Sequence, residues 1–377
     1  MRRIAWVVAL LVAGQPVAAC TFCGGSLAGR QTLREHHRTA AVVLVGTLRN
    51  PRFDPAGGGT TEFQVRTTVK ADRGTVPPLV TVRQYLPVIG DTPPDFVLFC
   101  GRAADGTLDP FHGAPCPPAV ARYLTDTAKV ADADSSARLA FFFKRLGDRE
   151  PTVASDAFLE LAKTPDAELV KAKAGFDPQT VRKLLTDQAT PAERLGVFAL
   201  LLGLCGSADD ARFLAAELDR RPLTVRVREN LGGYLTALAL QDQEAGWRRA
   251  TAALTDPARP FDQRLSALGA VRFFQATRPA ENRDRILACY RGVLAHGDIA
   301  DLVIEDLRRW KWWELTQDVL AAFDRPTHAG TLVRRGIVRY ALSCPRDEAK
   351  RFVEAVRGRD PKLVAAVEEG LKLAEGR

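Results

Sequence analysis

An internal repeat in the second half of the chain limits the possible folds most strongly. Five similar segments begin at first residues that are 34, 36, 37 and 34 positions apart: Arg194, Arg228, Arg264, Asp301 and Arg335. Second helices are expected between them at four places: Asp209–Leu218, Gln243–Leu254, Asn282–Leu294 and Gln317–Phe323. Linkers that contain Asp, Pro or Gly separate the helices. A helix pair repeated at this period predicts an α-solenoid, in which each pair covers the apolar face of its neighbour.

The repeated segments resemble HEAT repeats in a degenerate form. This resemblance implies that residues 117–377 form one all-α repeat domain, in which an earlier and weaker copy begins near Val153. One set of apolar and aromatic residues is expected to form its core: Phe198, Leu201, Leu231, Tyr234, Leu268, Phe273, Ile304, Leu307, Ile337 and Tyr340. Cys205, Cys289 and Cys344 are expected to be buried as small apolar residues.

The first 19 residues have the pattern of a secretory signal peptide. Two arginines follow Met1, an apolar run covers Ile4–Gly14, and small residues precede Cys20. The apolar run is shorter than the roughly 20 residues that span a bilayer. The chain is therefore expected to be exported, to the periplasm, the cell surface or the medium. Val17-Ala-Ala-Cys20 also fits the bacterial lipoprotein pattern, so a lipid on Cys20 is the expected means of any membrane contact.

The charge of the chain is moderate and spread along its length. The formal net charge of +8 falls to +6 when the signal removes Arg2 and Arg3. No basic tract or nucleic-acid recognition module is present. Nucleic acid is therefore not an expected partner.

Residues 20–116 predict a small strand-rich domain behind a short helix within 26–38. Four strands are expected: Ala40–Leu48, Thr61–Val69, Leu79–Leu86 and Phe96–Cys100. In the second, Phe63, Val65, Thr67 and Val69 alternate with polar residues, which is typical of a half-buried strand. Four or five short strands of this kind predict a small barrel or sandwich. The whole chain is thus α+β, with a β-barrel before a helical array.

Four cysteines of this domain predict two disulfides in an exported protein: Cys20, Cys23, Cys100 and Cys116. The residues alone leave three connectivities open. Cys20 and Cys23 have the spacing of a redox pair, but no strand precedes them, as a thioredoxin-like site requires. A zinc site with His36 and His37 is the other alternative, although the two histidines are adjacent rather than three to five residues apart.

The order of Cys-x-x-Cys, a short helix, the strand at 40–48 and the segments 63–74 and 95–116 resembles the netrin-type module. That module is the OB-like barrel shared with the tissue inhibitors of metalloproteinases. The resemblance implies disulfides from Cys20 to Cys100 and from Cys23 to Cys116. In those inhibitors the amine of the first cysteine binds a protease zinc, and its partner cysteine is one residue away. Two residues separate Cys20 from Cys23 here.

Two other groups of residues are candidates for binding or chemistry. The run Arg308-Arg-Trp-Lys-Trp-Trp313 offers Trp310, Trp312 and Trp313 as a platform for a flat ligand, with Arg308 and Arg309 for anionic groups. The alternative is a helix end whose tryptophans wedge between repeats. His112 lies near Asp109 and offers a metal-binding or acid–base pair, but the expected surroundings are a loop rich in Gly and Pro.

No phosphate-binding loop, zinc-protease motif or Rossmann fingerprint is present in the sequence. The whole chain resembles an uncharacterised family of exported bacterial proteins that begin with Cys-x-Phe-Cys and end in HEAT-like helices, a likeness that implies no activity. We therefore expect a non-catalytic binding or scaffolding protein without a cofactor, whose partner is another extracytoplasmic protein. The alternatives are inhibitor-like binding through the N-terminal Cys20 edge, and a redox or metal role for Cys20 and Cys23.

Overall fold

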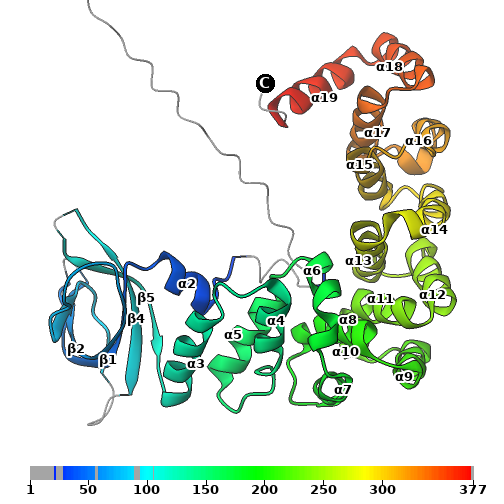
Figure 1. Cartoon of the computed structure of the whole chain (residues 1–377). Helices are drawn as coiled ribbons and strands as arrows, with labels where there is room; N and C mark the ends of the chain where they lie inside the picture. The colour runs from blue at the N-terminus through cyan, green and yellow to red at the C-terminus, as the bar shows by residue number, and fades with distance from the viewer. Residues whose placement is uncertain (1–20, 23–28, 56–57, 89–93, 105, 375–377) are drawn as a thin grey trace, which may run out of the picture. The chain divides into compact units, whose positions relative to one another are not determined.

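The chain forms a small antiparallel sheet followed by many helices, which confirms the predicted α+β class in this coarse form (Figure 1). The computed structural model describes residues 21–22, 29–55, 58–88, 94–104 and 106–374. The predicted signal peptide, Cys20 and Cys23 lie outside the described residues. The chain divides into two compact units, the first ending at Phe176 and the second running from Asp177 to Arg377.

The first unit combines the sheet with the first helices. Its elements are α2 (Leu33–Thr39), β1 (Val42–Arg52), β2 (Thr60–Ala71), β3 (Leu79–Val82), β4 (Asp95–Arg102), β5 (Leu108–Pro115), α3 (Pro118–Lys129), α4 (Ser135–Phe143), α5 (Pro151–Ala162), α6 (Asp166–Lys171) and the 3-10 turn η1 (Ala172–Gly175). The strands lie in the order β3-β2-β1-β4-β5 with antiparallel pairing throughout. The four predicted strands correspond to β1–β4, whereas β5 was predicted as a loop.

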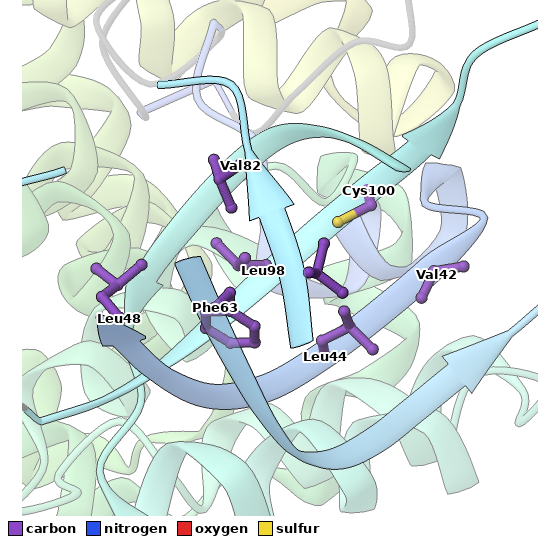
Figure 2. Packing of buried hydrophobic residues seen from close by; sticks show 8 residues of the cluster. Val42, Leu44, Leu48, Phe63, Val82, Leu98 and Cys100 are labelled. Carbon is purple, nitrogen blue, oxygen red and sulfur yellow. The ribbon is translucent and has the colours of Figure 1, made fainter. Parts of the chain in front are cut away.

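The middle of the sheet is buried on both faces. Val42 pairs with Cys100 and Leu44 with Leu98, and these side chains enter one apolar cluster with Phe63 on the inner face of the curved sheet (Figure 2). The intervening Val43 and Val45 face the other way and are also buried. Because both faces of β1 are buried here, successive residues at the start of the strand are apolar instead of alternating with polar ones.

The short helix α2 is fastened to α5 by three polar contacts. The backbone N–H of Leu33 donates to Asp156 at 2.7 Å, and Arg34 forms an ion pair with Glu160 at 2.7 Å. Lys163, which follows α5, forms an ion pair with Glu35 at 2.5 Å. These long-range contacts place α2 and α5 in the same unit as the sheet. The change from strands to helices along the chain lies between β5 and α3, before the end of this unit at Phe176.

The second unit is helical throughout its described part. Its elements are α7 (Pro178–Thr186), η2 (Ala192–Arg194), α8 (Leu195–Cys205), α9 (Ala208–Asp219), α10 (Val225–Glu229), α11 (Leu231–Gln241), α12 (Gln243–Thr255), α13 (Phe261–Thr277), α14 (Pro279–Val293), α15 (Ala300–Trp310), α16 (Thr316–Ala321), η3 (Pro326–His328), α17 (Thr331–Ser343), α18 (Asp347–Arg359) and α19 (Pro361–Ala374). Helices α11, α13, α15 and α17 lie in one row, with α12, α14 and α16 beside them (Figure 1). The four predicted second helices correspond to α9, α12, α14 and α16.

The core predicted for the helical region is confirmed residue by residue. All ten predicted side chains are at most 3% exposed: Phe198, Leu201, Leu231, Tyr234, Leu268, Phe273, Ile304, Leu307, Ile337 and Tyr340. Of the three predicted buried cysteines, Cys289 and Cys344 are buried and Cys205 is half-buried. Among the described residues, no helix combines the length and the apolar composition that crossing a membrane requires.

Successive helix pairs contact each other at recurring positions. The backbone N–H of Gly196 donates to the side-chain oxygen of Asn230 at 2.9 Å, and the N–H of Gly232 donates to Ser266 at 2.8 Å. Each of these contacts spans 34 residues. A Cβ atom on Gly233 would lie 2.3 Å from the carbonyl oxygen of Gly196, so α8 and α11 approach as closely as glycine allows.

Candidate binding surface

A groove crosses the starts of three helices in the second unit. It has a volume of about 430 Å³, and three helices contribute to its lining: α13 with Phe261, α15 with Asp301 and Leu302, and α17 with Thr331, Leu332 and Val333. Asp298 and Gly330, just ahead of α15 and α17, complete the lining. We call this feature the α13–α17 groove.

Bulky apolar side chains of this groove are left in contact with solvent. Leu332 is 72% exposed and Phe261 is 56% exposed. Leu265 is 39% exposed and lies one helical turn after Phe261, on the same side of α13. Single exposed apolar residues are common on protein surfaces, but several at one concave site indicate a surface that contacts another molecule.

Phe261 and Leu332 both lie in the first turn of their helices, where no earlier turn of the same helix flanks them. In α17, Val333, Gly336, Ile337 and Tyr340 repeat at intervals of three or four and are buried. Leu332 is the second residue of α17 and lies at the edge of this buried face, one helical turn before the small residue Gly336. The folding of α17 does not require an apolar residue at that position.

The charged residues of the groove are acidic. Arg264 is fully buried and donates both to the carbonyl oxygen of Leu254, at 2.9 Å, and to the carboxylate of Asp298. The Asp298 side chain is 52% exposed. Its carboxylate therefore contacts the buried Arg264 on one side and solvent on the other. The Asp301 carboxylate has no ion-pair or hydrogen-bond partner among the described residues.

The groove presents apolar side chains, two carboxylates and one hydroxyl group. Its lining contains no histidine or cysteine, and Thr331 supplies its one hydroxyl group. Over the described part of the chain, no group of three or more His, Cys, Asp or Glu residues could hold a metal ion. The arrangement can accept apolar side chains and a positive charge.

The predicted tryptophan platform lies at the end of α15 and just beyond it. Trp310 stacks on Tyr290 with ring centroids 5.6 Å apart, and Trp313 meets the ring of Tyr340 edge-on at 5.0 Å. Trp312 is 5% exposed and touches Trp310 edge-on. The structure thus brings the three tryptophans together as packing between α14, α15 and α17.

The two arginines predicted beside that platform are occupied within their own helix. Arg308 and Arg309 both donate to Glu305 at 2.8 Å. These hydrogen bonds and charges outweigh the effect of burial and lower the pKa of Glu305 to about 2. The guanidinium groups of Arg308 and Arg309 are therefore engaged by a carboxylate at neutral pH.

The predicted disulfide cysteines are only partly described. Cys100 and Cys116 are at most 1% exposed, and no disulfide joins them to each other or to another described residue. Burial, with a smaller contribution from nearby Asp109 and Asp95, raises the pKa of the Cys100 thiol to about 12 and that of Cys116 to about 11. Their predicted partners, Cys20 and Cys23, lie outside the described residues, so the pairing stays a prediction.

The histidines are arranged differently from either sequence hypothesis. His112 lies in β5 rather than in a loop, and its ring stacks on His36 of α2 with centroids 3.9 Å apart. Asp109 pairs with Gly101 in the β-ladder, whereas His112 pairs with Phe99. His37 lines a separate cavity beside Arg38 and Leu124. The ring that His112 contacts is therefore that of His36, and Asp109, its candidate partner in the sequence, lies at a different position of the ladder.

The α13–α17 groove was not predicted from the sequence. The available signal was a bulky apolar residue in the first turn of a helix, close to the Pro or Gly that precedes it, as at Phe261 after Pro260 and Leu332 near Gly330. Such residues are hard to distinguish from core residues until the helix is placed against its neighbours.

Comparisons with known proteins add no identity. No protein-family model matches the chain, and no curated protein matches it. Among solved structures, human deoxyhypusine hydroxylase in complex with glycerol is similar with a TM-score of 0.28 and 16% identity, over 66% of this chain and 100% of that chain. A similarity at this level supports no conclusion about fold or function.

Proposed function

We propose that this chain is an exported, non-catalytic binding or scaffolding protein whose helical region contacts another extracytoplasmic protein. The α13–α17 groove carries this proposal, because Phe261 and Leu332 expose bulky apolar side chains at one concave site. Burial of such side chains against a partner contributes roughly 25 cal/mol per Å² of apolar area removed from water.

The finer architecture that we propose for the helical region is a HEAT-like solenoid. It is supported by the recurring contacts of Gly196 with Asn230 and of Gly232 with Ser266, which join each helix pair to the next at equivalent positions. The small rotation from one repeat to the next gives solenoids extended concave surfaces, which such proteins use for binding.

For the strand region we propose a small OB-like, netrin-type barrel with the two disulfides implied by that resemblance. A cavity of about 270 Å³ has Val82, Gln84 and Leu86 on one side and residues 110–113 of β5 on the other. The two edge strands of the sheet, β3 and β5, therefore approach each other, as a curled sheet requires. Export remains a proposal that rests on the pattern of residues 1–19.

Affinity capture from the native host tests the function. The exported full chain is immobilised as wild type, as the double variant Phe261→Ala/Leu332→Ala, and as Leu373→Ala. Leu373 is the matched control, because it is 74% exposed on α19 and does not line the groove. We expect one protein to be enriched by wild type and by Leu373→Ala but lost with the double variant. Equal capture by all three proteins would refute a role for the groove.

Inhibitor-like binding through the Cys20 edge remains the alternative proposal. The backbone N–H of Thr21 donates to Asp166 at 3.2 Å, and its hydroxyl donates to the same carboxylate. The residue after Cys20 is thus held by α6. If the amine of Cys20 binds a protease zinc, one additional residue before Cys20 should abolish inhibition; unchanged inhibition would dismiss this alternative.

A further inference from the structure

We propose that the α13–α17 groove binds a protein segment in which a Lys or Arg lies next to a bulky apolar side chain. This inference rests on the proposed function and specifies the chemistry of its partner. The volume of about 430 Å³ lies within the roughly 300–1,000 Å³ of typical binding pockets.

The apolar half of the groove selects the apolar side chain. Phe261, Leu302 and Leu332 come from three different helices and surround one concave space. Val333 also lines the groove but is only 7% exposed, so this part of the lining belongs to the buried core of the unit. An inserted Leu or Phe side chain would remove the exposed area of Phe261 and Leu332 from water.

The acidic half of the groove selects the positive charge. Asp298 and Asp301 line it, whereas no Lys, Arg or His does. The buried guanidinium of Arg264 fixes the position of the Asp298 carboxylate, and Asp301 is unpaired among the described residues. A partner carboxylate would be repelled by the unpaired Asp301 and a partner ammonium or guanidinium group attracted to it, whereas the charge of Asp298 is already balanced by Arg264.

The charge of the whole chain makes this preference specific to the groove. The formal net charge is +8 for the full sequence and +6 without Arg2 and Arg3, so non-specific attraction over the rest of the surface favours anionic partners. If the chain binds a cationic peptide more tightly than an anionic one, the preference must therefore come from the groove and not from the charge of the whole surface. The acidic residues of the groove, Asp298 and Asp301, disfavour an anionic membrane surface. Binding to anionic vesicles is therefore a separate outcome that the test can distinguish.

Fluorescence anisotropy with three labelled peptides tests the inference on the full chain. The probes are a short peptide of alternating Lys and Leu, its Glu–Leu counterpart and its Lys–Ser counterpart. The groove variants are Leu332→Ala and Asp301→Asn. Their controls are Leu373→Ala and Asp284→Asn, because Asp284 is an exposed acid on α14 that does not line the groove.

We expect the Lys–Leu peptide to bind wild type most tightly, with a loss of about fivefold or more in Leu332→Ala and Asp301→Asn and no change in either control. Equal affinity for the Glu–Leu peptide, or no binding of the Lys–Leu peptide, would overturn the inference. Binding to phosphatidylserine vesicles that depends on Leu332 would overturn it in favour of a membrane. Glu–Leu binding that is lost in Leu332→Ala would leave the docking function intact and remove only the charge preference.

Discussion

His36 and His112 stack face to face with ring centroids 3.9 Å apart and planes 5° from parallel. Phe99 and Phe111 surround the pair, and the Nδ1 atom of His36 is buried without a hydrogen-bond partner among the described residues. Burial, followed by repulsion from His112, lowers the pKa of His36 to about 4. Burial lowers the pKa of His112 as well. The contact between α2 and β5 therefore depends on two neutral imidazoles.

This pair predicts that the first unit loses stability in mild acid. The unfolded chain binds a proton at His36 with a pKa near 6.5, whereas the folded chain binds it only near pH 4. The contribution of His36 to stability should therefore be complete above pH 6.5 and decrease as the pH drops from 6.5 toward 4. Urea unfolding at a series of pH values measures this loss.

His36→Phe isolates the contribution of the imidazole, since the ring that packs on His112 is kept while the titration of His36 is removed. The variant should unfold with a weaker dependence on pH in this range. His296→Phe, in the second unit, is the matched control and should retain the wild-type dependence. Identical pH profiles for wild type and His36→Phe would contradict this explanation.

Asp156 predicts a second effect, in the buried contact between α2, α3 and α5. Its carboxylate accepts from the backbone N–H of Leu33 and from the hydroxyl of Tyr123, both at 2.7 Å. Asp156→Ala leaves both donors buried and unpaired, and should destabilise the first unit by about 2–4 kcal/mol. Hydrogen exchange at the Leu33 amide measures the loss, and Tyr123→Phe should cost less. Unchanged protection of Leu33 in Asp156→Ala would refute the contact.

The pH dependence of Asp156 has the opposite sign to that of His36. Burial raises the pKa of Asp156 to about 6, above its ordinary value of 3.8. Its contribution to stability is therefore largest below pH 4 and decreases as the pH rises toward 6. Asp156→Asn should remove this decrease, which urea unfolding of the variant at pH 4 and pH 7 would show. A wild-type difference between the two pH values in Asp156→Asn would count against it.

Two glycine substitutions in the helical unit should change stability in opposite directions. Gly233→Ala would place a Cβ 2.3 Å from the backbone oxygen of Gly196, so α8 and α11 must separate at a cost of about 2–3 kcal/mol. Gly336→Ala meets Asp301 at 3.9 Å, an ordinary contact, and should gain about 0.5–1 kcal/mol of helix propensity. Differential scanning calorimetry of both variants checks the contrast. Equal melting temperatures would show that the two helices do not pack as closely as described.

The helical region was more predictable than the sheet. Its period placed the helix pairs, because each helix buries one face against its neighbours. In the sheet, β5 was missed because Pro110, Gly113 and Pro115 indicate a loop. An edge strand tolerates such residues, since only one of its sides pairs with a neighbour.

The predicted alternation in β2 was wrong beyond Val65. Bulges shift the register between β1 and β2, so that Thr68 rather than Thr67 pairs with Leu44. Contacts such as Leu33 with Asp156 join residues 123 positions apart, and no local pattern reports them. The groove was missed for a related reason, because the exposure of Leu332 depends on how α17 packs beside α15.

Site-specific photo-crosslinking in the native host tests the central claim most directly. A benzoylphenylalanine residue is placed at position 332 in the groove and, in a second protein, at position 373 on α19. The two native leucines are similarly exposed, at 72% and 74%. We expect one discrete protein adduct from position 332 and none from position 373. The same adducts from both positions, or no adduct from position 332, would contradict a docking role for the α13–α17 groove.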